Sequence, residues 1–358
     1  MRELLAELEA KARARLPAAH YDYFAGGAGQ EKTLLDNEAG FQRLSLMPRL
    51  LQGNLERNLR VELPGGPAAL PLVVAPTGFH RLADPAGERA TARAAARAGV
   101  PLLTGLAATV AVAEVTAAAR EVDPAAKVWF QLYLQSAPGV QAELVRRAET
   151  AGCTALVVTA DSPVFGRHRR DDQHGFHELP PGLRAANMVG LPGSADGDVR
   201  SIEMSARFTW EDIAALQAGT ELPLWMKGIL HPADVEPALN HGAQGLIVSN
   251  HGGRQLDRTP ASIEALPAIV RAVAGRVPVL LDGGVRDGID LALALALGAT
   301  AVGIGRPVLW GLAAEGEAGV DRVLAAFTDD VDQVLTLCGA TRPSDLTPSQ
   351  VHRRGELT

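Results

Sequence analysis

Eight short apolar runs, each followed by a segment of helical composition, constrain the fold of this 358-residue chain more than any other feature. Each run is rich in β-branched or aliphatic residues and ends in a polar or glycine-bearing turn. Continuous apolar strands that alternate with helices are typical of a parallel sheet covered on both faces. Eight such units predict a closed (β/α)8 barrel, the TIM barrel, rather than an open doubly wound sheet. We expect strands at 70–75, 100–103, 128–134, 155–159, 222–226, 245–249, 277–281 and 299–304, and helices among others at 88–98, 140–151, 233–240, 263–274 and 289–297.

Two segments stand outside this repeat. Residues 1–60 are predicted to form an N-terminal helical arm. Residues 165–210 follow the fourth strand and are rich in Gly, Pro, Asp and Ser, so we expect a mobile lid there. Because α/β barrels commonly reach this length as one unit, we expect a single domain over 1–358.

Composition excludes several classes of partner. The net charge of −7 and the pI near 5.8 argue against nucleic acid. The longest apolar run, residues 291–302, is too short to span a bilayer, and the N-terminus resembles an amphipathic helix rather than a signal peptide. Cys153 and Cys338 lie far apart without metal-ligand spacing, so we expect no metal site and a cytoplasmic protein.

The segment after the sixth strand, Ser-Asn-His-Gly-Gly-Arg-Gln-Leu-Asp (249–257), carries the strongest chemical signal. His251 can accept a proton near neutral pH, and Arg254 can hold a carboxylate with two parallel hydrogen bonds. A base beside a carboxylate clamp indicates chemistry on a small organic acid. A purely structural histidine in a polar loop is the alternative, and spacing alone does not separate the two.

Polar and glycine residues also end the other seven strands. In a barrel of this kind the carboxyl-terminal strand ends form the active-site face. Ligand-type groups at every strand end are hard to explain by packing. Together with Ser249 of the sixth strand, the residues concerned are Thr77, Gly78, Thr104, Gln131, Tyr133, Thr159, Asp161, Lys227, Asp282, Gly283, Gly284, Arg286, Gly305 and Arg306.

The last two strand ends fit a phosphate site, because each pairs a glycine-rich turn with an arginine. Lys227 ends an apolar strand, where a buried ammonium needs a negative partner such as a reduced flavin. A lysine that extends to solvent from the barrel mouth is one alternative. Another is a non-redox phosphate-binding barrel, such as an aldolase that uses Lys227 as a Schiff base.

With these motifs the chain resembles the FMN-dependent 2-hydroxy-acid oxidase and dehydrogenase family, which includes glycolate, lactate and mandelate-oxidising enzymes. The resemblance covers about residues 21–339 and rests on segments 21–28, 75–77, 131–133, 249–257, 282–286 and 304–307. It implies bound FMN, with its phosphate near Gly283, Gly284, Gly305, Arg306 and Arg286. The remaining cofactor contacts that it implies are Thr77, Gly78, Thr104, Gln131, Thr159, Lys227, Ser249 and Asp282.

The resemblance also implies oxidation of a 2-hydroxy acid to the 2-oxo acid. His251 would be the base and Asp161 its partner, while Lys227 would stabilise charge on the reduced flavin. Arg254 and Tyr23 would hold the substrate carboxylate, and Tyr133 its hydroxyl side. Oxygen is the expected electron acceptor, and a homotetramer is the expected assembly. The alternatives are a dehydrogenase that uses a quinone or protein acceptor, and a flavin-binding protein without catalysis.

Three positions depart from the family pattern. His168 stands where a second substrate-binding arginine is usual. Either Arg167 or Arg169 takes over that role, or His168 binds a different polar group, or the substrate lacks a standard carboxylate, or the loop is only locally shifted. Leu106 stands where glycolate-type enzymes often carry an aromatic residue, for which Phe165 is expected to compensate. Gly78 replaces a common alanine near flavin N5, which bears on reactivity with oxygen.

Overall fold

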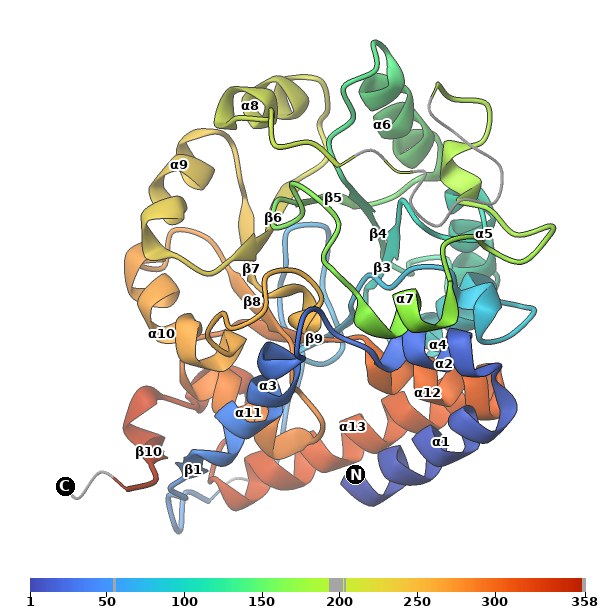
Figure 1. Cartoon of the computed structure of the whole chain (residues 1–358). Coiled ribbons are helices and arrows are strands. Elements are labelled where there is room, and N and C mark those ends of the chain that lie inside the picture. Colours follow the sequence, from blue (N-terminus) through green and yellow to red (C-terminus); the bar gives the residue numbers. More distant parts are fainter. Residues whose placement is uncertain (54–55, 193–201, 203, 356–358) are drawn as a thin grey trace.

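Eight parallel strands close into a barrel in the computed structural model, which describes residues 1–53, 56–192, 202 and 204–355 (Figure 1). Each strand pairs with its neighbour in sequence, and the last pairs with the first. The strands are β2 (Leu72–Val74), β3 (Leu102–Gly105), β4 (Val128–Leu132), β5 (Ala155–Thr159), β6 (Leu224–Ile229), β7 (Gly245–Val248), β8 (Val279–Asp282) and β9 (Ala301–Ile304).

Helices surround the barrel and connect successive strands (Figure 1). The connecting helices are α4 (Glu88–Arg97), α5 (Val112–Val122), α6 (Val140–Ala151), α7 (Arg169–His174), α8 (Trp210–Ala218), α9 (Val235–Asn240), α10 (Ser262–Val273), α11 (Gly288–Ala296) and α12 (Arg306–Glu315). The remaining helices are α1 (Arg2–Arg15), α2 (Ala18–Ala25), α3 (Lys32–Gln42) and α13 (Glu317–Leu337). Among the described residues, no helix is both long and apolar enough to cross a membrane.

The predicted barrel is confirmed, and the strand ends differ from the predicted ones by at most three residues. The largest differences lie in β6, which begins at Leu224 and continues through Lys227 to Ile229. A register shift between Lys227 and Ile229 lets this strand run past the predicted end. A bulge of this kind leaves no mark in apolar patterning, so the extension could not be read from the sequence.

The prediction of a helical arm over residues 1–60 is wrong beyond Gln42. Residues Leu44–Leu46 form β1, which pairs antiparallel with β10 (Val351–Arg353) near the other end of the chain. Pro48 and the left-handed Leu51 are incompatible with a continuous helix in this stretch. In the predicted lid, 165–210, the described part contains α7 and a 3-10 turn at Ala186–Met188, whereas 193–201 and 203 lie outside the described residues.

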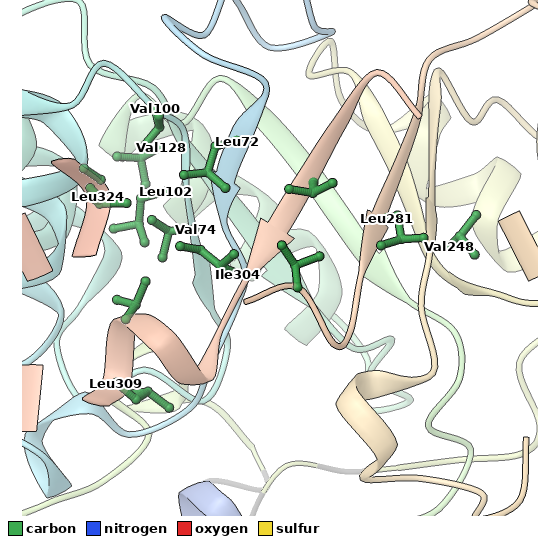
Figure 2. Close-up of a cluster of buried hydrophobic side chains, with 14 of the residues drawn as sticks. Leu72, Val74, Val100, Leu102, Val128, Val248, Leu281, Ile304, Leu309 and Leu324 are labelled. Atoms are coloured by element: carbon green, nitrogen blue, oxygen red, sulfur yellow. The ribbon is translucent and has the colours of Figure 1, made fainter. Parts of the chain in front are cut away.

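Outward-facing strand residues pack against the helices. Figure 2 shows Leu72, Val74 and Ile304 from the barrel beside Leu309 of α12 and Leu324 of α13. All five side chains belong to one buried cluster that continues around the barrel. Burial of one such side chain contributes about 1.5–3 kcal/mol, so this layer is the main source of stability.

A second cluster fills the amino-terminal half of the barrel interior. Trp129 and Trp225 stack there with ring centroids 5.0 Å apart. Gly245 makes room for them, because a Cβ at this position would lie 2.2 Å from the Trp225 ring. The Trp225 indole donates a hydrogen bond to the carbonyl oxygen of Pro64 at 3.0 Å, in a segment that follows the isolated bridge at Val61. The tryptophans therefore form the floor beneath the active-site face.

Candidate active site

Along five of the strands, the inward-facing side chains change from apolar to polar two residues further toward the carboxyl-terminal end. Side chains two residues apart share a face of a strand, so each polar residue lies directly above a member of the inner cluster. These polar residues are Gln131 above Trp129, Thr159 above Val157, Lys227 above Trp225, Ser249 above Ile247 and Asp282 above Leu280. Gln131, Lys227 and Asp282 line a cleft at the carboxyl-terminal end of the barrel. The predicted cofactor contacts Thr159 and Ser249 do not line it and instead hydrogen-bond to Gln131 and Lys227.

Lys227 is buried and paired. Its Nζ donates to Ser249 Oγ at 2.9 Å and lies 3.4 Å from an Asp282 carboxylate oxygen. Ser249 in turn donates to Asp282 and accepts the backbone N–H of His251 at 3.0 Å. The ammonium therefore already has a counter-ion within the protein, which accounts for its burial without solvent exposure.

His251 and Asp161 come together from different strand ends. His251 Nδ1 lies 2.9 Å from Asp161 Oδ1, which leaves Nε2 as the ring nitrogen available to a ligand. Burial raises the pKa of the Asp161 carboxyl, but the charge of His251 and its hydrogen bond outweigh that effect and hold the pKa below its ordinary value. Asp161 is therefore a carboxylate at neutral pH, suited to stabilise a protonated imidazole.

Two further contacts hold the Asp161 carboxylate in place. Ser162 donates to Asp161 Oδ1 at 3.0 Å and accepts a hydrogen bond from Gln255. Gly228, at the β6 bulge, adopts φ +105°, and a Cβ there would lie 2.6 Å from the Asp161 Cβ. The bulge thus creates the space that the Asp161 side chain occupies. Sequence patterning did not identify Ser162, Gln255 or Gly228 as site residues.

Tyr23, Arg254 and Tyr133 also line the cleft. Arg254 Nη1 donates to the carbonyl oxygens of Tyr23 and Gly26 at 2.6 and 3.0 Å, and its guanidinium lies 5.0 Å from the Tyr23 ring centroid. Burial raises the pKa of Tyr23 to about 12. Burial also raises the pKa of Tyr133, and the charge of Asp161 adds to that effect. Both hydroxyls are therefore protonated and able to donate hydrogen bonds.

His168 lines the same cleft, but both of its ring nitrogens face protein acceptors. Nδ1 lies 3.0 Å from Asp171 Oδ2, and Nε2 lies 2.8 Å from the carbonyl oxygen of Arg254. Arg167 and Arg169 are exposed and do not line the cleft. Neither arginine therefore replaces the missing one in this arrangement.

The two arginines predicted to hold the phosphate, Arg286 and Arg306, line the cleft together with Gly283, Gly284 and Gly305. Arg306, at the start of α12, donates to the carbonyl oxygens of Phe24, Gly26 and Gly252. Burial lowers the pKa of Arg306 to about 9, and the charges of Arg254 and Arg286 add to that effect. Crowded guanidinium groups at a helix N-terminus form an environment that favours a bound dianion.

Comparison with known proteins identifies the family. Residues 12–353 match the family described as FMN-dependent dehydrogenase. The chain is 42% identical to an L-lactate oxidase of Nostoc sp., with 97% of each chain covered, and 42% identical to a 4-hydroxymandelate oxidase of Amycolatopsis orientalis, with 94% of each covered. A crystal structure of mandelate oxidase superposes with a TM-score of 0.88 at 40% identity, covering 97% of this chain and 98% of the other.

The chain belongs to the FMN-dependent dehydrogenase family. Membership makes it an oxidoreductase with FMN as its cofactor, in agreement with the sequence-based expectation. FMN supplies a two-electron acceptor when it is bound. The donor set of the cleft fits that group, because the Gln131 amide and the Lys227 ammonium line it, together with the guanidinium groups of Arg286 and Arg306 and three glycines. The Gln131 side chain is oriented by a hydrogen bond that its Nε2 donates to Thr159 Oγ1 at 2.9 Å.

At the other side of the expected FMN site, a hydrogen-bonded network fixes the loop that follows β2. Thr77 Oγ1 lies 2.6 Å from His80 Nε2, and His80 Nδ1 lies 3.0 Å from Thr91 Oγ1. The carboxylate of buried Glu88 accepts from the backbone N–H groups of His80 and Thr109. Thr77 and Gly78 line the cleft, and this network holds the loop that carries them.

Two positions assigned from sequence are corrected by the register of β3. Thr104 shares the outward face of Leu102, and its buried hydroxyl has no hydrogen-bond partner among the described residues. Leu106 is fully buried in the outer cluster. The neighbours Gly105 and Ala107 line the cleft instead. A shift of one residue reverses the face of a strand, and an apolar run carries no signal that fixes this register.

Proposed function

We propose that this enzyme oxidises a 2-hydroxy acid to the 2-oxo acid, passing two electrons to FMN and then to oxygen, which yields hydrogen peroxide. The observation that carries the proposal is the His251–Asp161 pair, at 2.9 Å, in a cleft that also contains Arg254 and two protonated tyrosines. The names of the relatives, L-lactate oxidase and 4-hydroxymandelate oxidase, point to the same reaction.

Each cleft residue has a distinct part in this reaction. His251 Nε2 takes the proton of the substrate hydroxyl, and the Asp161 carboxylate stabilises the positive charge that results. Arg254 and the Tyr23 hydroxyl bind the acyl end of the substrate, and the Tyr133 hydroxyl binds its 2-oxygen. Lys227 would present positive charge to bound FMN, which would serve as the two-electron acceptor.

We infer that the substrate has a bulky or aromatic side chain. Gly78, Gly105 and Ala107 leave space on one wall of the cleft. Phe165 and Met204 add apolar surface to the lining of the cleft. Contact between such a wall and an aromatic ring favours binding through buried apolar area. Ala107, and not Leu106, faces the cleft, so its small side chain leaves room there while Phe165 supplies an aromatic surface.

Among the alternatives, the ion pair of Lys227 with Asp282 argues against a Schiff-base lysine, because a nucleophilic amine must be uncharged. Oxygen as the acceptor is favoured over a quinone or a protein by the oxidase relatives. The buried free thiols of Cys153 and Cys338 support a reducing compartment such as the cytoplasm. A single domain over 1–358 and a homotetramer remain predictions, the latter open to light scattering of the purified protein.

The test is anaerobic reduction of the bound FMN by a panel of 2-hydroxy acids, followed by peroxide formation when air is admitted. His251→Asn should retain FMN but slow reduction by a factor of about 100 or more. His231→Asn changes an exposed histidine outside the cleft and serves as the control. If no acid bleaches the flavin, or if the His251 variant matches the wild type, the proposed function is wrong.

A further inference from the structure

His168 holds each of its ring nitrogens against a hydrogen-bond acceptor. Nδ1 lies 3.0 Å from a carboxylate oxygen of Asp171, and Nε2 lies 2.8 Å from the carbonyl oxygen of Arg254. A neutral imidazole carries a single N–H, so it can satisfy only one of these partners. The arrangement therefore requires one further proton, which His168 and Asp171 share either as an imidazolium with a carboxylate or as an imidazole with a carboxylic acid.

The surroundings of Asp171 favour retention of that proton. The Asp171 side chain is buried, and no arginine or lysine pairs with it in the part of the chain that the structure describes. A buried carboxylate without a cation is unstable, so His168 is its charge partner. Two further titratable groups, Tyr23 of α2 and Arg254 of the loop after β7, line the same part of the cleft. The pair thus acts as one unit with a single exchangeable proton.

The contact with Arg254 holds the main chain of the proposed carboxylate clamp. Arg254 Nη1 is committed to two main-chain carbonyl oxygens, while Nε and Nη2 have no acceptor among the described residues. Those two donors are a parallel pair that suits both oxygens of a carboxylate. The Arg254 main chain is fixed by His168 at its carbonyl and by the carbonyl oxygen of His251 at its N–H, at 3.2 Å. Gly166 permits the close packing, because a Cβ there would lie 2.1 Å from the Arg254 carbonyl oxygen.

We propose that His168 is a positioning residue for this clamp: the proton that it shares with Asp171 holds the Arg254 main chain, so that a 2-hydroxy acid binds tightly only while the proton is present. The assignment rests on the proposed function, in which Arg254 binds the substrate carboxylate. When the pair loses its proton, one of the two contacts of His168 becomes a repulsion between a lone pair and an acceptor. The loop can then shift, and the two free donors of Arg254 no longer meet the carboxylate in a fixed position.

Binding of the unreactive acid 2-oxo-2-phenylacetate to the oxidised holoenzyme, measured by calorimetry, tests this role. His168→Asn keeps a donor near Nδ1 but none near Nε2, so the dissociation constant should rise by about tenfold or more. His168→Gln places an N–H near the position of Nε2 and should bind within about threefold of the wild type. An Asn variant that binds as tightly as the wild type overturns the proposal, and so does a Gln variant that binds as weakly as the Asn variant.

Asp171→Asn separates the proton from the shape of the pair. The new amide can donate to Nδ1, which leaves a neutral His168 with its single N–H on Nε2 for Arg254. Between about pH 6 and pH 10, binding to the wild type should weaken by about tenfold or more relative to this variant. His251 is present in both proteins, so the ratio of their dissociation constants removes its contribution. A ratio that does not change with pH contradicts the proposal.

The second histidine of α7 provides the matched control. His174 is exposed and pairs with Asp22 of α2, as does Arg170 of the same helix. His174→Gln should leave the dissociation constant and its pH dependence unchanged, because none of these three side chains lines the cleft. A pH dependence that disappears in this variant would trace the effect to the packing of α7 on α2 and overturn the assignment to His168.

Failure of the proposed function would look different. If no 2-hydroxy acid reduces FMN in the wild type, the oxidase assignment is wrong, whatever His168 does. If the acids reduce FMN while 2-oxo-2-phenylacetate binds equally to the wild type, His168→Asn and Asp171→Asn at every pH, the oxidase function stands and the positioning role alone fails.

Discussion

At the scale of single residues, the proposed base, His251, has an unfavourable backbone conformation. His251 adopts φ +59°, and Gly252 and Gly253 continue the left-handed turn with φ +60° and +76°. A left-handed histidine costs of order 1–3 kcal/mol and persists only where surrounding contacts impose it. Ser249 and Asp161 supply such contacts, one to the His251 backbone and the other to its ring.

Replacement of Asp161 by Asn isolates the charge in this pair. The amide keeps the size of the side chain but no longer compensates a protonated imidazole, so FMN reduction should slow by about 100-fold or more. Stopped-flow reduction under anaerobic conditions measures the effect, and flavin content reports correct folding. Asp36→Asn, at an exposed position on α3, is the matched control. A rate within a factor of about three of the wild type would remove Asp161 from the mechanism.

The limits of sequence reasoning also appear at single positions. His251, Arg254, Lys227 and Asp282 could be placed in the site because polar groups at the ends of apolar strands are conspicuous. Thr104 could not be told from Gly105, because their assignment depends on a register of one residue. Asp171 lies on a short helix in an irregular segment, and no periodicity predicts that its carboxylate turns back toward the barrel.

At the scale of elements, the bulge in β6 links strand geometry to the base. Gly228→Ala introduces a Cβ within 2.6 Å of Asp161 Cβ at a position where φ is +105°. We expect a lower melting temperature and a rate of FMN reduction lowered by about tenfold or more, since Asp161 must move. Gly275→Ala is the control. Gly275 has φ +74°, and an added Cβ would meet no atom within 4 Å, so this variant bears only the free-energy cost of a left-handed alanine. Equal activity in the two variants would show that the bulge does not position Asp161.

The strands and helices of the barrel could be predicted from the sequence better than individual site residues. Buried parallel strands are apolar on both faces, so each appears as a continuous run that is visible without any partner. The pairing of β1 with β10 depends on segments about 300 residues apart, and neither segment is distinctive alone. Helix α3 ends at Gln42 because the next residues, Leu44–Leu46, form β1 and pair with the distant strand β10.

At the scale of the whole molecule, α1 is tied to the barrel through Arg2, which pairs with Asp287 and Asp290 of the α11 region at 2.5 and 2.7 Å. Burial raises the pKa of Asp290 to about 7, and the charge of Asp287 adds to the effect. The fold therefore favours the neutral carboxyl. The stability that this group contributes is complete below pH 4 and declines as the pH rises through 7.

Asp290→Asn tests this pH dependence, because the amide does not titrate. The free energy of unfolding of the wild type, relative to the variant, should fall between pH 4.5 and pH 8, by at most about 4 kcal/mol. Denaturant titrations at several pH values measure the difference. A difference that is constant with pH, or that grows as the pH rises, would contradict the raised pKa.

The arginine cluster predicts that anions stabilise the cofactor-free protein. Inorganic phosphate, at about ten times its dissociation constant, should add roughly 1.4 kcal/mol and raise the melting temperature by about 2 °C. Potassium chloride at equal ionic strength is the control, and Arg306→Gln should lose most of the effect. Equal shifts with both salts would show that the cluster binds no specific anion.

The stacked indoles beneath the active-site face have an optical consequence. Trp129 and Trp225 are wholly screened from water and stand two residues below Gln131 and Lys227, which is one side-chain layer of the barrel. Excited indoles at that separation lose their energy to an isoalloxazine ring rather than emit it. Ultraviolet emission from these two residues should therefore brighten as the flavin leaves and dim as it returns, so that the barrel floor reports the occupancy of the site without any added label.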